Sequence, residues 1–154
     1  MASFDDLQPC NYFGESLSPF LRAIGWLESG RAYPTGSVDP RVFSKLIELQ
    51  KDPWQPVAFM GVHGCDLCVY ASEASGTRNL FIPGNGFAYV CPELVSHYMN
   101  AHAYAPPAEF CAAVLDCPPM RSMQYLKALL ECARPLVRLG QGRSTDPGDA
   151  VLAN

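Results

Sequence analysis

The sequence lacks any apolar run approaching the roughly 20 residues that a bilayer-spanning helix requires. Residues 1–6 carry two aspartates and do not resemble the apolar segment of a signal peptide. We therefore expect a cytoplasmic protein with no membrane partner. Lysine and arginine number only 11 among 154 residues, and they are scattered along the chain. Because nucleic-acid binding normally needs clustered positive charge, we expect no nucleic-acid partner.

Several motifs that identify enzymes are also missing. There is no Gly-x-x-x-x-Gly-Lys phosphate loop, no Gly-x-Ser-x-Gly nucleophile elbow and no His-Glu-x-x-His zinc motif. Cys91-Pro92-Glu93 matches part of the zinc-deaminase pattern, but the Cys-x-x-Cys pair lies upstream of it, which is the wrong order. These absences favour a protein that is not an enzyme.

The composition is that of an ordinary folded domain, with 49% hydrophobic and 17% charged residues. The length suits one hydrophobic core, and we expect a single globular domain over residues 1–139. Residues 140–154 are rich in glycine, serine, aspartate and proline, so we expect a flexible C-terminal tail there.

Hydrophobic periodicity and capping signals predict about five helices and about four short strands. Ser-Pro and Asp-Pro pairs mark two helix starts, because the first residue can cap and proline suits the first helical turn. The predicted helices span residues 19–29, 40–51, 92–103, 107–115 and 120–133, and proline at position 135 should kink or end the last one. The predicted strands span residues 57–62, 69–71, 79–82 and 87–90.

The loops between the predicted strands are short, so these strands should pair in antiparallel fashion. The fold class is therefore α+β: a small antiparallel β-meander flanked by helices, with a zinc-knuckle-like hairpin at the Cys-x-x-Cys pair. No internal repeat is apparent.

Metal-ligand residues are concentrated in two short stretches, which hold all three histidines of the chain. One stretch contains a Cys-x-x-Cys pair, and the other contains two histidines five residues apart. Thiolates and imidazoles are the usual ligands of zinc. We expect a Zn²⁺ site formed by Cys65, Cys68, His97 and His102, with His63 in reserve.

The spacing of His97 and His102 sets a condition on this site. On a straight helix their side chains would point about 140° apart. Both can bind one ion only if the helix changes geometry or ends near residue 103, which Pro106 and Pro107 favour.

Two other interpretations of the cysteines remain open. Seven cysteines cannot all pair, and buried cysteine often packs as a small apolar residue. A thioredoxin-like redox pair is less favoured, because such pairs precede a helix and no helix signal follows Cys68.

Four sequence motifs resemble those of an uncharacterised bacterial protein family, a domain of unknown function. They are His-x-Cys-x-Leu-Cys in residues 63–68, Asn-Leu-Phe-Ile-Pro-Gly in 79–84, Pro-Glu-Leu-x-x-His-Tyr in 92–98 and His-x-Tyr-x-Pro-Pro in 102–107. The Cys-Pro-Pro-Met run of residues 117–120 is similar as well. The resemblance implies a single bacterial cytoplasmic domain and does not assign an activity.

Two functions follow from these observations. The first is a non-catalytic protein with a structural zinc that acts through a protein partner, for example as an immunity-type inhibitor or a regulatory subunit. The alternative is a zinc-dependent hydrolase with Glu93 as the general base, because Glu93 precedes His97 by four residues on the predicted helix. The oligomeric state does not follow from the sequence.

Overall fold

The computed structural model describes residues 2–57, 61–70 and 74–141. Its α+β class is the one predicted. The elements in chain order are the 3₁₀ helix η1 (Ser18–Phe20), β1 (Leu21–Ala23), α1 (Pro40–Leu49), β2 (His63–Gly64), β3 (Ser75–Gly76), β4 (Asn79–Pro83), β5 (Ala88–Pro92), α2 (Val95–Ala101), α3 (Ala108–Asp116) and α4 (Met123–Gln141).

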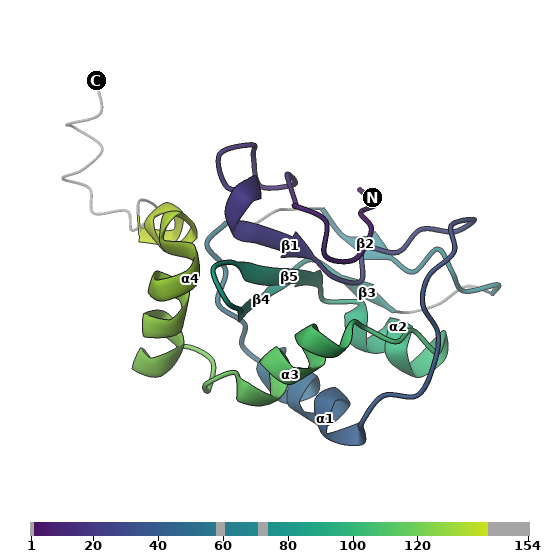
Figure 1. Ribbon diagram of the computed structural model, residues 1–154. Helices are drawn as coiled ribbons and strands as arrows, with labels where there is room; N and C mark the ends of the chain where they lie inside the picture. Colours follow the sequence, from purple (N-terminus) through teal and green to yellow (C-terminus); the bar gives the residue numbers. More distant parts are fainter. Residues whose placement is uncertain (1, 58–60, 71–73, 142–154) are drawn as a thin grey trace.

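The main sheet has three strands in the order β1-β5-β4 (Figure 1). Strands β4 and β5 form the predicted antiparallel hairpin, with Phe81 opposite Val90. Strand β1 pairs in parallel with β5, with Leu21 opposite Ala88. The expectation of a purely antiparallel meander is therefore wrong, since the sheet is mixed.

The strand β1 occupies part of the segment predicted as the first helix, residues 19–29, so that prediction is wrong. The Ser-Pro start forms only the short helix η1, and the chain is extended from Leu21. Residues 21–27 are buried except for Arg22, and Gly25 has a left-handed backbone with φ of 69°. An apolar run buried on both faces fits a strand and the segment after it, whatever its local helical spacing.

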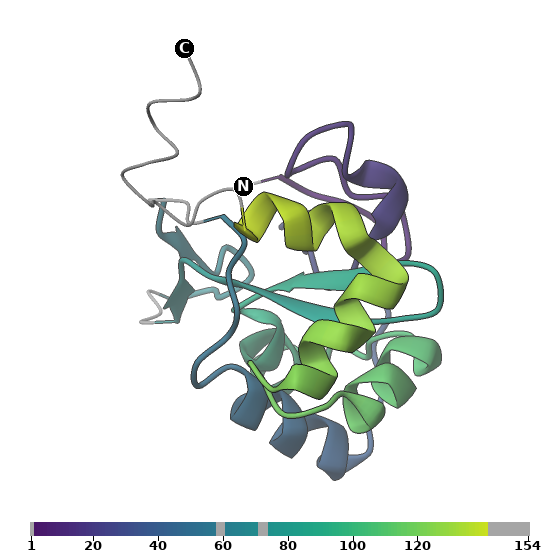
Figure 2. The same cartoon turned by 90° about the vertical axis from the view of Figure 1, so that its left-hand side faces the viewer.

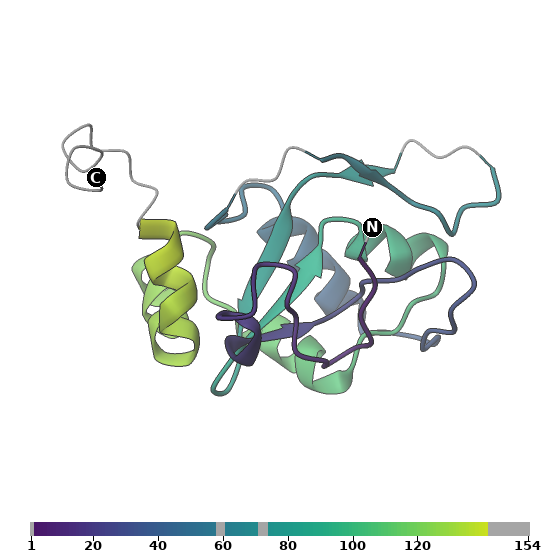
Figure 3. The same cartoon turned by 90° about the horizontal axis from the view of Figure 1, so that it is seen from above.

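A second, two-stranded sheet pairs β2 with β3 in antiparallel fashion. It lies along one side of the molecule in Figure 3. The predicted strand at residues 57–62 falls partly outside the described residues. Val69 and Tyr70, from the predicted strand at 69–71, form a bend, and residue 71 also falls outside them.

The helices after residue 39 lie close to their predicted positions. The Asp39 side chain caps α1 by accepting a hydrogen bond of 2.9 Å from the Arg41 amide. Helix α2 begins at Val95 rather than at residue 92. Helix α4 continues past Pro135 with a kink at Ala133, where φ is −151° and ψ is 55°, which confirms the predicted kink.

Helices α1, α2 and α3 lie together below the main sheet in Figure 1, and α4 lies to its left. Helix α4 contacts β4, β5 and η1 and passes in front of the sheet in Figure 2. Among the described residues, no helix is both long enough and apolar enough to cross a membrane. Residues 142–154, most of the predicted tail, lie outside the described part, so the proposed domain boundary at 139 stays a prediction.

Candidate metal centre

Four side chains meet where the loop after β2 approaches the end of α2. The ligand atoms of Cys65, Cys68, His97 and His102 all lie within 4.8 Å of one another. His102 Nε2 is 3.4 Å from the Sγ atoms of both Cys65 and Cys68, and His97 Nε2 is 3.4 Å from Cys68 Sγ. The structure therefore brings together two thiols and two imidazoles from segments that are distant in the sequence.

These separations match the edges of a zinc tetrahedron. With Zn–S near 2.3 Å and Zn–N near 2.0–2.1 Å, sulfur and nitrogen ligands of one ion lie about 3.5 Å apart. Hydrogen bonding explains the contacts less completely, because an imidazole nitrogen carries a single lone pair or a single proton. His102 Nε2 approaches two sulfurs at the same distance. That arrangement fits four ligands around a common centre.

The loop that carries the cysteines is held at several points. The Cys65 amide donates a hydrogen bond of 3.3 Å to the Ala74 carbonyl, next to the pairing of β2 with β3. The Asp66 carboxylate accepts a 3.3 Å hydrogen bond from the Ser29 amide. Leu67, between the two cysteines, packs against the hydrophobic core. These contacts hold the loop at Cys65 and between the two thiols.

His97 and His102 come together because α2 ends before His102, as expected from their spacing of five residues. The helix stops at Ala101, and His102 adopts a non-helical backbone with φ of −123°. Ala103 is left-handed, with φ of 53°. The Tyr98 carbonyl accepts hydrogen bonds from the amides of His102 and Tyr104, at 3.0 and 3.1 Å. The rings of His97 and His102 are consequently 5.2 Å apart, centroid to centroid.

Residues 33–36, which precede α1, form hydrogen bonds with residues 102–105 at the C-terminal end of α2. The Tyr33 hydroxyl donates a 3.1 Å hydrogen bond to the His102 carbonyl. The Gly36 amide donates to the Ala103 carbonyl at 3.1 Å, and the Ala105 amide donates to the Pro34 carbonyl at 3.0 Å. The position of His102 is therefore supported by backbone contacts outside its own helix.

The surroundings of Cys65 and His97 favour the neutral forms of these two side chains. Burial raises the pKa of the Cys65 thiol and outweighs the lowering effect of hydrogen bonds from the backbone of Leu67 and Cys68, while the Cys68 side chain adds to the rise. Burial lowers the pKa of His97, with a further contribution from the charge of His102. A neutral imidazole is the form that binds a metal, whereas each thiol must lose its proton. Metal binding here would therefore release protons.

Tyr98 adds a buried donor close to these residues. Its side chain is fully buried, and its hydroxyl has no hydrogen-bond partner among the described residues. The pKa of Tyr98 is raised by burial and then by the neighbouring Cys65, Asp66 and Cys68. A hydroxyl donor beside the thiols suits anionic thiolates, which is the state that a bound metal requires. The sequence analysis missed Tyr98, although it precedes His102 by one helical turn.

Glu93 lies just before α2, so it is not in the first helical turn where the sequence analysis placed it. Its carboxylate accepts hydrogen bonds from the Arg78 side chain at 2.6 and 3.1 Å and from the Thr77 and Arg78 amides at 3.1 and 3.2 Å. Burial acts to raise its pKa, but these hydrogen bonds leave the pKa below its ordinary value. To act as a base at the cluster, Glu93 would first have to break them.

His63 does not join the four-residue cluster. It lies in β2, where it is paired with Gly76. Its side chain lines a small cavity of about 20 Å³ together with Trp26 and Glu93. The four clustered residues could hold a metal ion without it.

Comparisons with known proteins identify a family but not an activity. No curated protein and no solved structure matches the chain. A family model described as "Domain of unknown function (DUF7919)" matches residues 2–115, which include all four residues of the cluster. The chain therefore belongs to this family of domains of unknown function.

Proposed function

We propose that this protein is a non-catalytic domain in which Cys65, Cys68, His97 and His102 hold one structural Zn²⁺. The observation that carries the proposal is the approach of their four ligand atoms to within 4.8 Å of one another. Two thiolates and two imidazoles form a typical structural zinc set. Four protein ligands fill a tetrahedral ion and leave no position for a substrate or a catalytic water.

The role of the ion would be to fasten two distant segments. The cysteines follow β2, and the histidines lie at the end of α2. The two-stranded sheet of β2 and β3 is short, and the loop that carries the thiols is half-exposed. A zinc bound between loop and helix would contribute its binding free energy to folding, because the site does not exist in the unfolded chain.

The proposed mode of action is binding to another protein, as an immunity-type or regulatory partner. Its support is the exposure of large apolar side chains on both sides of the cysteines. Val62 is 67% exposed, Val69 is 91% exposed and Tyr70 is 86% exposed. Exposed apolar side chains that gather in one region are typical of interaction sites. A structural zinc would hold this loop in one conformation for a partner.

Metal analysis of untagged protein, purified without added metal or chelator, tests the zinc proposal. We expect about one zinc ion per chain. Replacement by Co²⁺ should give the absorption of a tetrahedral thiolate site, and Cys65→Ser should remove it. Cys111→Ser is the matched control, because Cys111 is also half-buried but lies outside the cluster. Zinc far below one ion per chain in the unaltered protein would refute the proposal.

A further inference from the structure

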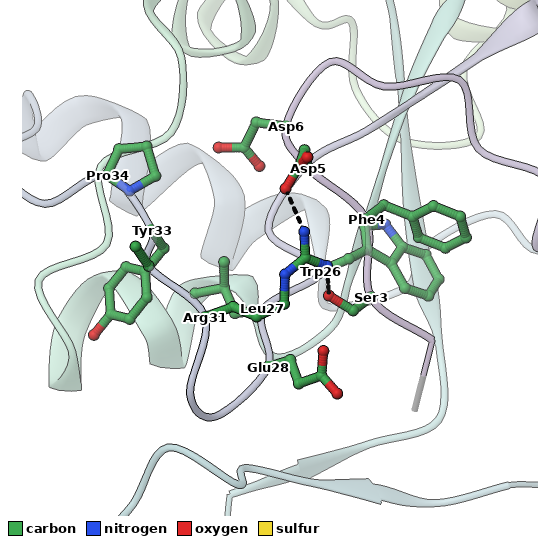
Figure 4. A pocket seen from close by; sticks show the side chains of 11 residues that line it. Ser3, Phe4, Asp5, Asp6, Trp26, Leu27, Glu28, Arg31, Tyr33 and Pro34 are labelled. Atoms are coloured by element: carbon green, nitrogen blue, oxygen red, sulfur yellow. Dashed lines mark hydrogen bonds and ion pairs between the residues drawn. The ribbon is translucent and has the colours of Figure 1, made fainter.

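A second pocket lies between the N-terminal segment and the loop after β1 (Figure 4). Its volume is about 210 Å³. Phe4 and Trp26 lie on one side of it, in edge-to-face contact with 5.4 Å between ring centroids. Tyr33 and Pro34 lie on the opposite side. The pocket therefore has aromatic and apolar walls on two sides.

The pocket also carries a surplus of negative charge. Its charged residues are three acids and one base: Asp5, Asp6, Glu28 and Arg31. Arg31 is already engaged, since it forms an ion pair of 2.8 Å with Asp5 and donates a 2.7 Å hydrogen bond to the Ser3 hydroxyl. Within the described part of the chain, Asp6 and Glu28 form no ion pair, so their two charges are not neutralised.

Asp6 is held in place by the fold. Its carboxylate accepts a 3.0 Å hydrogen bond from the Gly25 amide. It also accepts the single proton of the fully buried Tyr104 hydroxyl, which lies 2.9 Å from Oδ1 and 2.8 Å from Oδ2. The next residue, Leu7, has a left-handed backbone with φ of 68°, which costs about 1 kcal/mol in a residue other than glycine. The backbone is therefore strained at Leu7, next to the fixed, half-buried carboxylate of Asp6.

Gly25 is required for this arrangement. Its φ is 69°, and a Cβ atom there would lie 3.1 Å from Val95 and 3.3 Å from Tyr104.

Burial raises the pKa of Asp6, and no cation offsets this effect among its described neighbours. A positively charged ligand would supply the missing countercharge and stabilise the ionised carboxylate.

We infer that this pocket binds an alkylguanidinium group, the chemical group of an arginine side chain. A planar guanidinium can stack against aromatic rings and also donate several hydrogen bonds to carboxylates. Phe4 and Tyr33 provide half-buried rings, and Asp6 and Glu28 provide the negative charge. This inference depends on neither the metal centre nor a particular protein partner.

Titration of the full-length protein with N-acetyl-arginine methylamide tests the inference. The side-chain indole NMR signal of Trp26 reports on the pocket wall, and Trp54→Phe assigns it, because the chain has two tryptophans. We expect a saturable shift with the arginine compound and none with its neutral citrulline counterpart. An equal response to the citrulline compound, or no saturable shift, would overturn the inference.

Charge variants test the role of the carboxylates. Glu28→Gln should weaken binding a few-fold, since Glu28 is exposed, and Asp6→Asn should weaken it about tenfold. Glu48→Gln on α1 removes the same charge from an exposed site outside the pocket and should leave binding unchanged. Equal affinities for Glu28→Gln and Glu48→Gln would overturn the inference even if Asp6→Asn fails to fold.

The same titration distinguishes two sources of the guanidinium. Free arginine carries an α-ammonium and an α-carboxylate, whereas an arginine within a protein chain has neutral amide groups at these positions, as the blocked compound does. Tighter binding of the blocked compound would indicate an arginine side chain of another protein. Binding of free arginine at least as tight would indicate a small-molecule ligand.

Discussion

The Arg78 guanidinium donates from both Nε and Nη2 to the same Glu93 oxygen, Oε1, at 3.1 and 2.6 Å. Arg78 lies between β3 and β4, and Glu93 lies in the turn between β5 and α2. The ion pair thus connects the two segments from which the cysteine loop and the histidine helix extend. It should align these segments before any metal binds, which gives Glu93 a structural role.

The first prediction concerns Glu93 and pH. Glu93→Gln should lower the free energy of unfolding at pH 7 by about 1–2 kcal/mol, because hydrogen bonds to a charged carboxylate are lost. The folded-state pKa lies below the ordinary value of 4.5, so this contribution is complete above about pH 4.5. It should fade as the pH falls through the lower, folded-state pKa. Thermal unfolding with a chelator present, over a pH series, measures the difference, and Glu48→Gln should show none.

The second prediction concerns Gly76, which packs against Glu93. A Cβ atom at Gly76 would lie 2.8 Å from Glu93 Cβ, so Gly76→Ala should destabilise the protein by about 1–3 kcal/mol. Gly64→Ala, on the paired strand, is the control, because its nearest neighbour would lie at 3.9 Å. Chemical denaturation of both variants gives the comparison. Equal stabilities would contradict the described packing of Glu93.

The third prediction concerns the thiols. If zinc is structural, Cys65→Ser and Cys68→Ser should each lower the melting temperature by about 10 °C or more, since ligand loss removes part of the folding free energy. Cys111→Ser should have a much smaller effect. Addition of a strong chelator to the unaltered protein should reproduce the loss. Similar small effects for all three serine variants would argue against a structural metal.

The fourth prediction separates the three histidines. His97→Ala and His102→Ala should each reduce zinc content and Co²⁺ absorption strongly, because each removes one of four ligands. His63→Ala should retain the metal, since His63 lies outside the cluster. Metal loss on His63→Ala with both other variants still loaded would assign the site to a different ligand set.

The fifth prediction concerns the left-handed turn after α2. Ala103→Gly should stabilise the fold by about 1 kcal/mol, because glycine adopts a φ of 53° without steric cost. Ala101→Gly should instead destabilise it slightly, since Ala101 is also exposed but helical. Denaturant midpoints of the two variants measure the contrast. Destabilisation by Ala103→Gly would mean that the chain does not turn as described.

Local signals predicted much of the fold after residue 39. Asp39 and Pro40 mark the start of α1 because capping and proline geometry act over one turn. The glycine-rich turn between β4 and β5 likewise identifies their hairpin, with Gly86 at a φ of 83°. Strand β1 could not be predicted in this way, because its partner β5 is distant in sequence and burial outweighed the helical spacing of residues 20–27.

Part of the candidate site could likewise be predicted from local sequence, and part depends on long-range contacts. The ligand types and the Cys-x-x-Cys spacing are local and visible in the sequence. The end of α2, which brings His97 and His102 together, was also expected from the local pair Pro106 and Pro107. The contacts from residues 33–36 that hold this helix end are long-range, and no local pattern encodes them. The pocket lined by Phe4 and Trp26 could not be predicted from the sequence for the same reason, since its walls come from an irregular N-terminal segment and a distant loop.

The parallel pairing of β1 with β5 has a consequence during synthesis. The Trp26 indole donates to the Val90 carbonyl, and these residues are 64 positions apart. Strand β1 therefore leaves the ribosome long before its partner exists. Until β5 emerges, Leu21, Ile24 and Trp26 have no sheet to cover them, and closing so long a loop is slow. Nascent chains stalled before residue 88 should accordingly bind chaperones at this segment, whereas chains released after α2 should not.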